Sequence, residues 1–175
     1  MSKLIIIRGN SGSGKSTIAK KLKYEMGYGT MLIPQDMVRR DMLRVRDVPD
    51  NPAIQLIYDM ACYGKQIGYD VIIEGILPRR LYGAMFEKLA AQFDNTHVYY
   101  FGLSFEETLR RHETKPDARD FGEKEMREWW CERDMLGEND RIITSDMSED
   151  EIITRIIKDI TEDENKLLNN QRAKI

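Results

Sequence analysis

A short apolar strand, a glycine-rich turn and a helix follow one another in the first 22 residues, and this order constrains the fold most. Residues 4–7 read Leu-Ile-Ile-Ile, a β-branched run typical of a strand buried on both faces. Residues 9–16 read Gly-Asn-Ser-Gly-Ser-Gly-Lys-Ser and fit the pattern G-x-x-x-x-G-K-[ST] at every specified position. Residues 17–22 continue with helical periodicity. Because a strand and a helix flank the motif, we predict a phosphate-binding loop and not an ordinary turn.

This loop predicts that the chain binds a nucleoside triphosphate with Mg²⁺. Its glycines let backbone N–H groups converge on phosphate oxygens, and the helix N-terminus adds partial positive charge at the same place. Lys15 would reach the β- and γ-phosphates, and the Ser16 hydroxyl would bind Mg²⁺. The predicted nucleotide-binding residues of this loop are Gly9, Asn10, Ser11, Gly12, Ser13, Gly14, Lys15, Ser16 and Thr17.

The composition is that of an ordinary globular chain. Its 175 residues are 41% apolar and 33% charged, and the net charge of −3 predicts no chain-wide positive surface for nucleic acid. Cys62 and Cys131 lack the spacing of a metal site, so we expect reduced thiols. We see neither a leader segment nor an apolar run of membrane-spanning length, and therefore expect a cytoplasmic protein without membrane contact.

Alternating strands and helices are expected along the rest of the chain. Further strands are predicted at 30–33, 70–75, 96–102 and 141–144, with helices at 36–43, 53–67, 78–93, 104–112 and 123–135 and a last helix from 148. This alternation predicts an α/β fold whose five-stranded parallel sheet has helices on both faces and ligands at the carboxyl ends of the strands. Residues 1–160 are expected to form one domain, and 161–175 a polar helix end or tail.

The order of these parts resembles the small P-loop kinases, a group that includes nucleoside monophosphate kinases, gluconate and shikimate kinases, chloramphenicol phosphotransferase and the kinase half of polynucleotide kinase. The runs 109–113 (Leu-Arg-Arg-His-Glu) and 121–123 (Phe-Gly-Glu), with Trp129-Trp130, resemble a bacterial kinase branch. The resemblance covers about residues 3–160. It implies a P-loop NTPase three-layer sandwich with a short helical lid, ATP and Mg²⁺ as cofactors, and transfer of the γ-phosphoryl group to a small polar or anionic acceptor.

Two carboxylates follow predicted strands at the expected ligand edge. Asp36 lies where many of these kinases keep a carboxylate that accepts the acceptor's hydroxyl proton or helps to hold Mg²⁺. Capping of the following helix is the alternative for Asp36 and does not exclude that role. Glu74 ends the apolar strand 71–73 in the form of a Walker B position, and we expect it at the metal and near the acceptor.

Arginines are the candidates for binding an anionic acceptor, since the guanidinium fork matches carboxylate or phosphate. The candidates are Arg39, Arg40, Arg79 and Arg80. On a helix, Arg40 and Arg44 would share a face, while Arg39 would lie about 100° away. Residues 74–80 are similar to the D-G-[FY]-P-R signature of adenylate kinases, but Glu replaces Asp and one extra residue precedes the proline. These differences put a nucleoside monophosphate acceptor in doubt.

The segment 111–127 resembles the mobile lid of these kinases, and an ordinary charged loop is the alternative. Arg111, with Arg119 or Arg127, would stabilise the charge on the transferred phosphoryl group. Thr144 follows the fifth strand, where related kinases hold adenine with backbone groups. Trp129 and Trp130 cannot both face the core from one helix, so one is expected in the core and one at its rim, with base stacking as the alternative.

Three other functions compete with a small-molecule kinase. Residues 114–117 (Thr-Lys-Pro-Asp) fit a guanine-binding signature, but they follow a helix instead of a strand, which indicates an accidental match. A polynucleotide 5′-hydroxyl kinase would explain the arginines, although no interleaved basic and aromatic face supports it. A regulatory module would bind ATP without any acceptor-dependent turnover. The sequence leaves the acceptor and the oligomeric state open.

Overall fold

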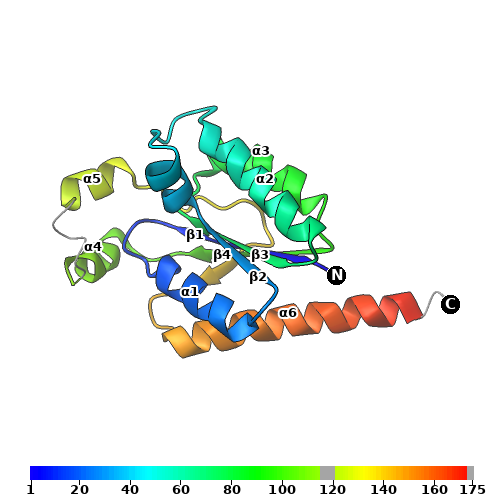
Figure 1. The fold of residues 1–175 in the computed structure, drawn as a ribbon. Helices are drawn as coiled ribbons and strands as arrows, with labels where there is room; N and C mark the ends of the chain where they lie inside the picture. The colour runs from blue at the N-terminus through cyan, green and yellow to red at the C-terminus, as the bar shows by residue number, and fades with distance from the viewer. Residues whose placement is uncertain (115–120, 173–175) are drawn as a thin grey trace.

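Five parallel strands form one sheet, in the order β2-β3-β1-β4-β5, in the computed structural model, which describes residues 1–114 and 121–172 (Figure 1). The strands are β1 (Lys3–Gly9), β2 (Thr30–Pro34), β3 (Asp70–Gly75), β4 (Asn95–Phe101) and β5 (Arg141–Ile143). β1 lies at the centre, with Ile5 opposite Ile72 on β3 and His97 on β4. The predicted five-stranded parallel sheet is confirmed.

Helices connect the strands, and several begin at the predicted caps. The helices are α1 (Lys15–Met26), α2 (Pro52–Gln66), α3 (Arg79–Ala90), α4 (Phe105–Glu113), α5 (Glu123–Glu128) and α6 (Glu149–Arg172). The Asn51 side chain accepts a hydrogen bond from the Ala53 N–H at 3.1 Å, and Ser104 Oγ accepts one from the Glu107 N–H at 3.2 Å. Each bond satisfies an N–H group that the first helical turn leaves without a partner.

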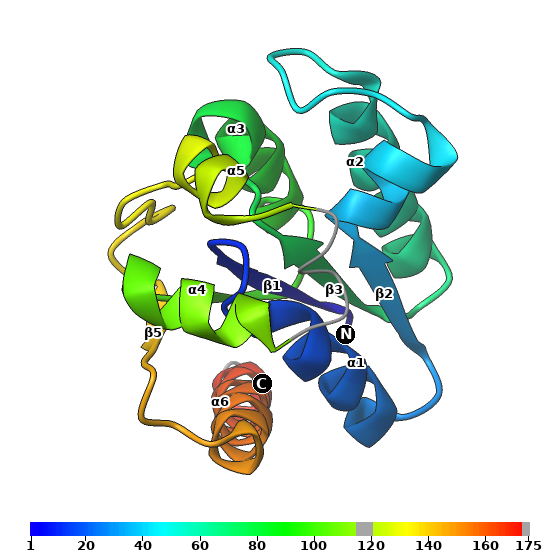
Figure 2. The ribbon, with the colours of Figure 1, turned by 90° about the vertical axis from the view of Figure 1, so that its left-hand side faces the viewer.

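The helices cover both faces of the sheet, which gives three layers (Figure 1). Successive side chains of β1 point to opposite faces, so Ile6 packs with α2 and α3, whereas Ile5 and Ile7 pack with α1 and α6. All three isoleucines are buried, and each buried side chain of this size contributes roughly 1.5–3 kcal/mol. Figure 2 shows α4 and α5 in front of the end of the sheet, away from both packed faces.

The helix predicted at 36–43 differs in kind and length. It is a π-helix, η1 (Met37–Met42), because the Leu43 N–H bonds to the carbonyl of Val38, five residues back, at 3.1 Å. Arg44 follows in a left-handed conformation with φ 53°. The prediction that Arg40 and Arg44 share a helical face is therefore wrong.

The helix predicted at 123–135 ends seven residues early, at Glu128. Helical continuation would direct the Cys131 N–H to the carbonyl of Arg127. Instead the Asn10 side chain accepts that N–H at 2.8 Å, and Arg133 adopts φ 41°. A long-range hydrogen bond thus replaces the next helical one, which the local sequence does not reveal.

Among residues 1–114 and 121–172, no helix combines the length and apolar character that a membrane crossing needs.

Candidate active site

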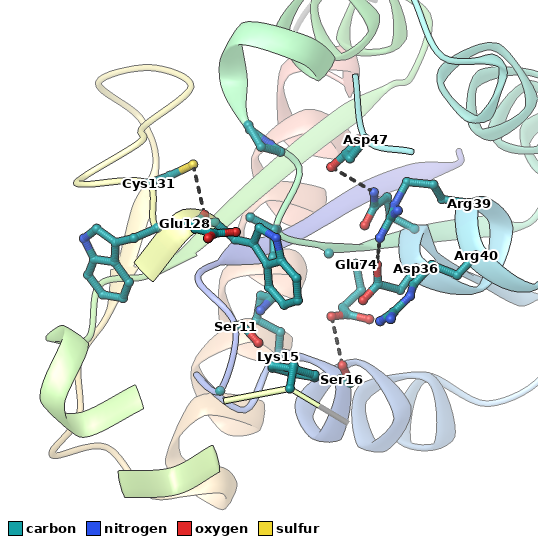
Figure 3. A pocket seen from close by; sticks show the side chains of 18 of the residues that line it. Ser11, Lys15, Ser16, Asp36, Arg39, Arg40, Asp47, Glu74, Glu128 and Cys131 are labelled. Carbon is teal, nitrogen blue, oxygen red and sulfur yellow. Dashed lines mark hydrogen bonds and ion pairs between the residues drawn. The ribbon is translucent and has the colours of Figure 1, made fainter. Parts of the chain in front are cut away.

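A cleft of about 630 Å³ opens at the carboxyl ends of β1, β2 and β3. Its lining comes from the loop after β1, the end of β3, the segments that follow β2 and β3, and residues 128–131 at the end of α5, with His112 and Phe121. Figure 3 shows Lys15 and Ser16 in the same cleft as Asp36, Arg40 and Cys131. A parallel α/β sheet is expected to bind ligands at this edge.

The predicted phosphate loop connects β1 to α1 and forms one side of the cleft. Lys15 Nζ donates hydrogen bonds to the carbonyl of Asn10 at 2.7 Å and to Ser13 Oγ at 3.3 Å. Gly12 has φ 79°, and a Cβ at this position would lie 2.4 Å from the carbonyl oxygen of Thr108. The close approach of α4 to the loop therefore requires glycine there.

A hydroxyl and a carboxylate meet beside this loop. Ser16 Oγ donates a hydrogen bond to Glu74 Oε1 at 3.0 Å, and Glu74 is only 7% exposed. Burial raises the pKa of Glu74, and the positive charge of Lys15 opposes that shift. Oxygen ligands of these two kinds suit Mg²⁺, which takes few protein ligands and keeps several waters. Ser16 and Glu74 therefore fit the predicted metal site.

Asp36 lines the cleft at the end of β2, and its side chain is 58% exposed. One carboxylate oxygen accepts a hydrogen bond from Arg39 Nη2 at 2.8 Å. Asp36 is the N-cap residue of η1 by position, but its side chain makes no capping hydrogen bond. The side chain therefore faces the cleft together with its arginine partner, and its geometry gives no support to the capping alternative.

Three arginines line the cleft with side chains that make no ion pair or hydrogen bond to the residues that the structure describes. They are Arg40, Arg46 and Arg80. Arg46 was not predicted, because it lies in a loop with no local motif. Arg79 lies elsewhere: its Nη1 donates to the carbonyl of Met135 at 3.4 Å, and it is outside the described lining. Of the predicted arginines after β3, the structure thus brings Arg80 to the cleft.

A buried hydrogen-bond network, which the sequence did not predict, supports the side of the cleft that carries Arg46 and Arg80. Tyr82 Oη donates to Asp47 Oδ1 at 2.8 Å and accepts from Gln35 Nε2 at 2.9 Å. Burial raises the pKa of Tyr82, so the phenol remains protonated and can donate. The network joins α3 to the loop that carries Arg46. Its members are far apart in sequence, and no spacing rule connects them.

Residues 129–131 line the cleft, and two side chains from the β1 region hold the segment 129–134. The Asn10 amide accepts from the Cys131 N–H at 2.8 Å and donates to the Cys131 carbonyl at 2.9 Å. Arg8, which is fully buried, contacts Asp134 Oδ2 at 2.6 Å and the Leu77 carbonyl at 2.6 Å. The segment 129–134 is therefore held at two positions, by Arg8 on β1 and by Asn10 in the phosphate loop.

Trp129 and Trp130 both line the cleft, and neither is buried in the core. Trp129 is 40% exposed. The prediction that one of the two indoles enters the core is wrong, because the helix ends at Glu128 and does not present either residue to the sheet.

The predicted lid residues fall in different places. Arg111 Nη1 lies 3.5 Å from the carbonyl of Ser13 in the phosphate loop, and its Nε binds Glu107 Oε1 at 2.5 Å. Arg127 binds Glu123 at 2.7 Å and lies over the Phe105 ring, 4.1 Å from its centroid. Neither arginine is in the described lining of the cleft. Arg119 lies outside the described residues.

The predicted adenine-binding residue, Thr144, directly follows β5 and is exposed. It lies outside the described lining of the cleft. His112 is buried and borders the cleft, with Nε2 2.8 Å from the carbonyl of Phe121.

Comparison with solved structures identifies the architecture. A gluconokinase from Sinorhizobium meliloti superposes with a TM-score of 0.65 at 17% identity, over 97% of this chain and 97% of that one. The APS kinase of Mycobacterium tuberculosis, solved with AMPPNP and APS, gives a TM-score of 0.63 at 19% identity, over 90% of this chain and 96% of that one. The fold is that of the P-loop kinases.

A chain of an RNA repair complex is also similar, with a TM-score of 0.57 at 20% identity. That match covers 73% of this chain but only 42% of the other. Neither a family model nor a curated protein matches the sequence.

Proposed function

We propose that this chain is an ATP- and Mg²⁺-dependent kinase that transfers the γ-phosphoryl group to a hydroxyl or phosphate of a small polar or anionic acceptor. One observation carries the proposal. The phosphate loop with its Ser16–Glu74 pair opens into the same cleft as Asp36 and the unpaired arginines. Donor and acceptor would therefore bind side by side, which phosphoryl transfer requires.

The donor half would bind Mg·ATP. Backbone N–H groups of residues 9–17 would surround the phosphates, and Lys15 would leave its loop contacts for the β- and γ-phosphates. Ser16 and Glu74 would hold Mg²⁺. The ion would neutralise charge on the phosphate oxygens during transfer. Thr144, after β5, is the proposed position for adenine binding by backbone groups.

The acceptor half would position and deprotonate the attacking group. As the acceptor oxygen bonds to the γ-phosphorus, the bond from that phosphorus to the bridging oxygen of ADP breaks. The hydroxyl proton goes to Asp36, which Arg39 orients through their 2.8 Å contact. Arg39, Arg40 and Arg80 are proposed to bind the acceptor, and Arg79 would do so only after leaving Met135.

Arg111 is the proposed charge-stabilising arginine among the predicted lid residues, because its guanidinium already lies beside the phosphate loop. Arg127 would have to leave Glu123 to reach the transferred group. For Arg119, which lies outside the described residues, the same charge-stabilising role is proposed from the sequence alone.

A polynucleotide 5′-hydroxyl kinase is the second candidate function. The likeness to a chain of an RNA repair complex and the three unpaired arginines favour it. It predicts binding of 5′-hydroxyl oligonucleotides that weakens steeply with salt, because arginine–phosphate contacts release counterions.

The test is ADP release from Mg·ATP across a panel of acceptors: nucleosides, nucleotides, sugars, sugar acids, aminoglycosides, chloramphenicol and 5′-hydroxyl oligonucleotides. We expect one class to stimulate turnover, and Lys15→Ala and Asp36→Asn to abolish the stimulation. Lys23→Ala, an exposed lysine on the same helix, is the matched control. ATP binding without stimulation by any acceptor would instead favour the regulatory module.

A further inference from the structure

The two tryptophans of this chain are neighbours in sequence, and both line the cleft. We propose that the acceptor carries a flat ring and an anionic group, with the ring against Trp129 and Trp130 and the anion at Arg40, Arg46 and Arg80. The proposal rests on the proposed function, because it names the acceptor class of that same cleft.

The indoles have apolar surface that the fold leaves uncovered. Trp129 is 40% exposed and Trp130 is partly exposed, although both stand in a cleft rich in charged groups. An aromatic side chain contributes most when its surface is removed from water, and a flat ring can stack on an indole face. A ring of the acceptor would provide that cover.

Aromatic neighbours support both indoles. Trp130 meets Phe105 edge to face, with ring centroids 5.2 Å apart. Trp129 packs against Phe121 at 5.1 Å, and Phe121 stacks on His112 at 4.3 Å. These contacts restrict the rotamers of the indoles before any ligand arrives. A ligand therefore loses little binding free energy in ordering them.

The position of the indoles relative to the phosphate loop is also fixed. Both hydrogen bonds of the Asn10 amide go to the backbone of Cys131, the residue that follows Trp130. Tyr100 Oη also donates to the Cys131 carbonyl, at 3.2 Å. A ring held at the indoles would consequently stand at a defined distance from the transferred phosphoryl group.

The arginines on the acceptor side favour an anion. Asp36 is ion-paired with Arg39, whereas Asp47 and Glu74 accept hydrogen bonds from the hydroxyls of Tyr82 and Ser16. In the described part of the chain, the side chains of Arg40, Arg46 and Arg80 have neither an ion pair nor a hydrogen bond. The lining has no large excess of positive charge, but the open guanidinium donors of these arginines match a phosphate or carboxylate.

These observations together favour ring-bearing anions, such as nucleoside monophosphates, over open-chain sugar acids. Residues 74–80 put a nucleoside monophosphate acceptor in doubt, because they depart from the adenylate kinase signature. Of the residues proposed here to bind the acceptor, however, only Arg80 comes from that segment. Stacking of a base on an aromatic side chain changes affinity by about 5- to 150-fold.

Tryptophan fluorescence tests the proposal directly, since both reporters line the cleft. The wild-type chain is saturated with Mg²⁺ and AMPPNP to fill the donor half, and then titrated with the four nucleoside 5′-monophosphates, the uncharged nucleosides and gluconate. We expect saturable quenching by at least one monophosphate, at least tenfold weaker binding of its nucleoside, and weaker binding still of gluconate. Trp129→Phe and Trp130→Phe leave one reporter each and show which indole the ring contacts.

Variants separate the ring from the charge. Trp129→Leu and Trp130→Leu should weaken monophosphate binding, measured by calorimetry, by about 5- to 150-fold. Arg46→Met should weaken the monophosphate but not the nucleoside, and Arg155→Met on α6 is the control. Gluconate binding as tightly as every monophosphate, or leucine variants that bind unchanged, would overturn the proposal. Phosphorylation of a ring-free acceptor at wild-type rates by both leucine variants would also overturn it while leaving the kinase intact. Ring binding without transfer to any acceptor would support it and refute the kinase.

Discussion

The donor and acceptor halves of the cleft are built in different ways. Apart from Glu74 on β3, the donor half uses consecutive residues of one loop, whose conformation depends on glycines and on hydrogen bonds within the loop. The acceptor half combines residues from 35–48, 74–80 and 128–131, which only long-range contacts bring together. Substitutions should therefore damage acceptor binding and donor binding separately.

Substitution of Lys15, a residue of the donor half, should have the largest effect on turnover. Lys15→Ala removes the cation that would stabilise charge on the transferring phosphoryl group, and we expect turnover to fall by about 10³-fold or more. Acceptor affinity, measured by fluorescence titration, should change less than twofold. An equal loss of acceptor binding would mean that the two halves are not separable.

Loss of Arg8 should cost the most folding stability. Arg8→Met leaves Asp134 without its ion-pair partner, at a cost of about 3 kcal/mol in the free energy of urea unfolding. The double variant Arg8→Met/Asp134→Leu should recover part of that loss, because no carboxylate is left unpaired. Arg127→Met, which breaks the exposed pair with Glu123, should cost less than about 1 kcal/mol.

Loss of the Asn10 side chain should weaken the acceptor half selectively. Asn10→Ala removes both hydrogen bonds to Cys131, each contributing about 1 kcal/mol, and frees the segment that carries both tryptophans. We expect the acceptor KM to rise about tenfold, while the Kd of ATP, measured by calorimetry, changes less than threefold. Asn10→Asp keeps the hydrogen bond from the Cys131 N–H, so its acceptor KM should lie between those of the wild type and Asn10→Ala. Equal effects on ATP and acceptor would contradict this assignment.

The smallest effect concerns Glu107, which holds Arg111 beside the phosphate loop. Hydrogen bonds from Arg110 and then Arg111 hold the pKa of Glu107 at about 2, below its usual 4.5. Its contribution to stability is therefore fully present above pH 4.5 and is lost as the pH falls toward 2. Glu107→Gln should lower the urea midpoint slightly at pH 7, and the difference from wild type should shrink between pH 5 and pH 3. Glu106→Gln, exposed on the same turn, is the control and should leave the urea midpoint at pH 7 unchanged.

The sequence predicted most of the fold, because its signals are local. The apolar runs around Ile6 and Ile72 and the caps at Asn51 and Ser104 act over a few residues, and the structure confirms the strands and helix starts that they predict. The end of α5 was mispredicted for the opposite reason. Asn10, more than 100 residues away, takes the N–H that would have continued that helix.

The same distinction explains which parts of the site could be predicted. The loop at Lys15 follows a fixed pattern because consecutive backbone groups shape it. The roles of Asp47 and Tyr82 became visible only in three dimensions, since their hydrogen bonds span up to 47 positions of the chain, and Arg46 lines the cleft from the same loop as Asp47. For Trp129 and Trp130 the sequence predicted one indole in the core and one at its rim, with base stacking as the alternative, and not that both indoles would line the cleft.

Transfer of radiolabelled γ-phosphate tests the central claim, that donor and acceptor share one cleft. Mg·ATP labelled at the γ-position is incubated with the chain and each acceptor of the panel, and the labelled products are separated by chromatography. We expect label in one phosphorylated organic acceptor, and we expect Lys15→Ala and Asp36→Asn to lose this product while Lys23→Ala keeps it. Label found only in inorganic phosphate, at a rate that no acceptor changes, would contradict it.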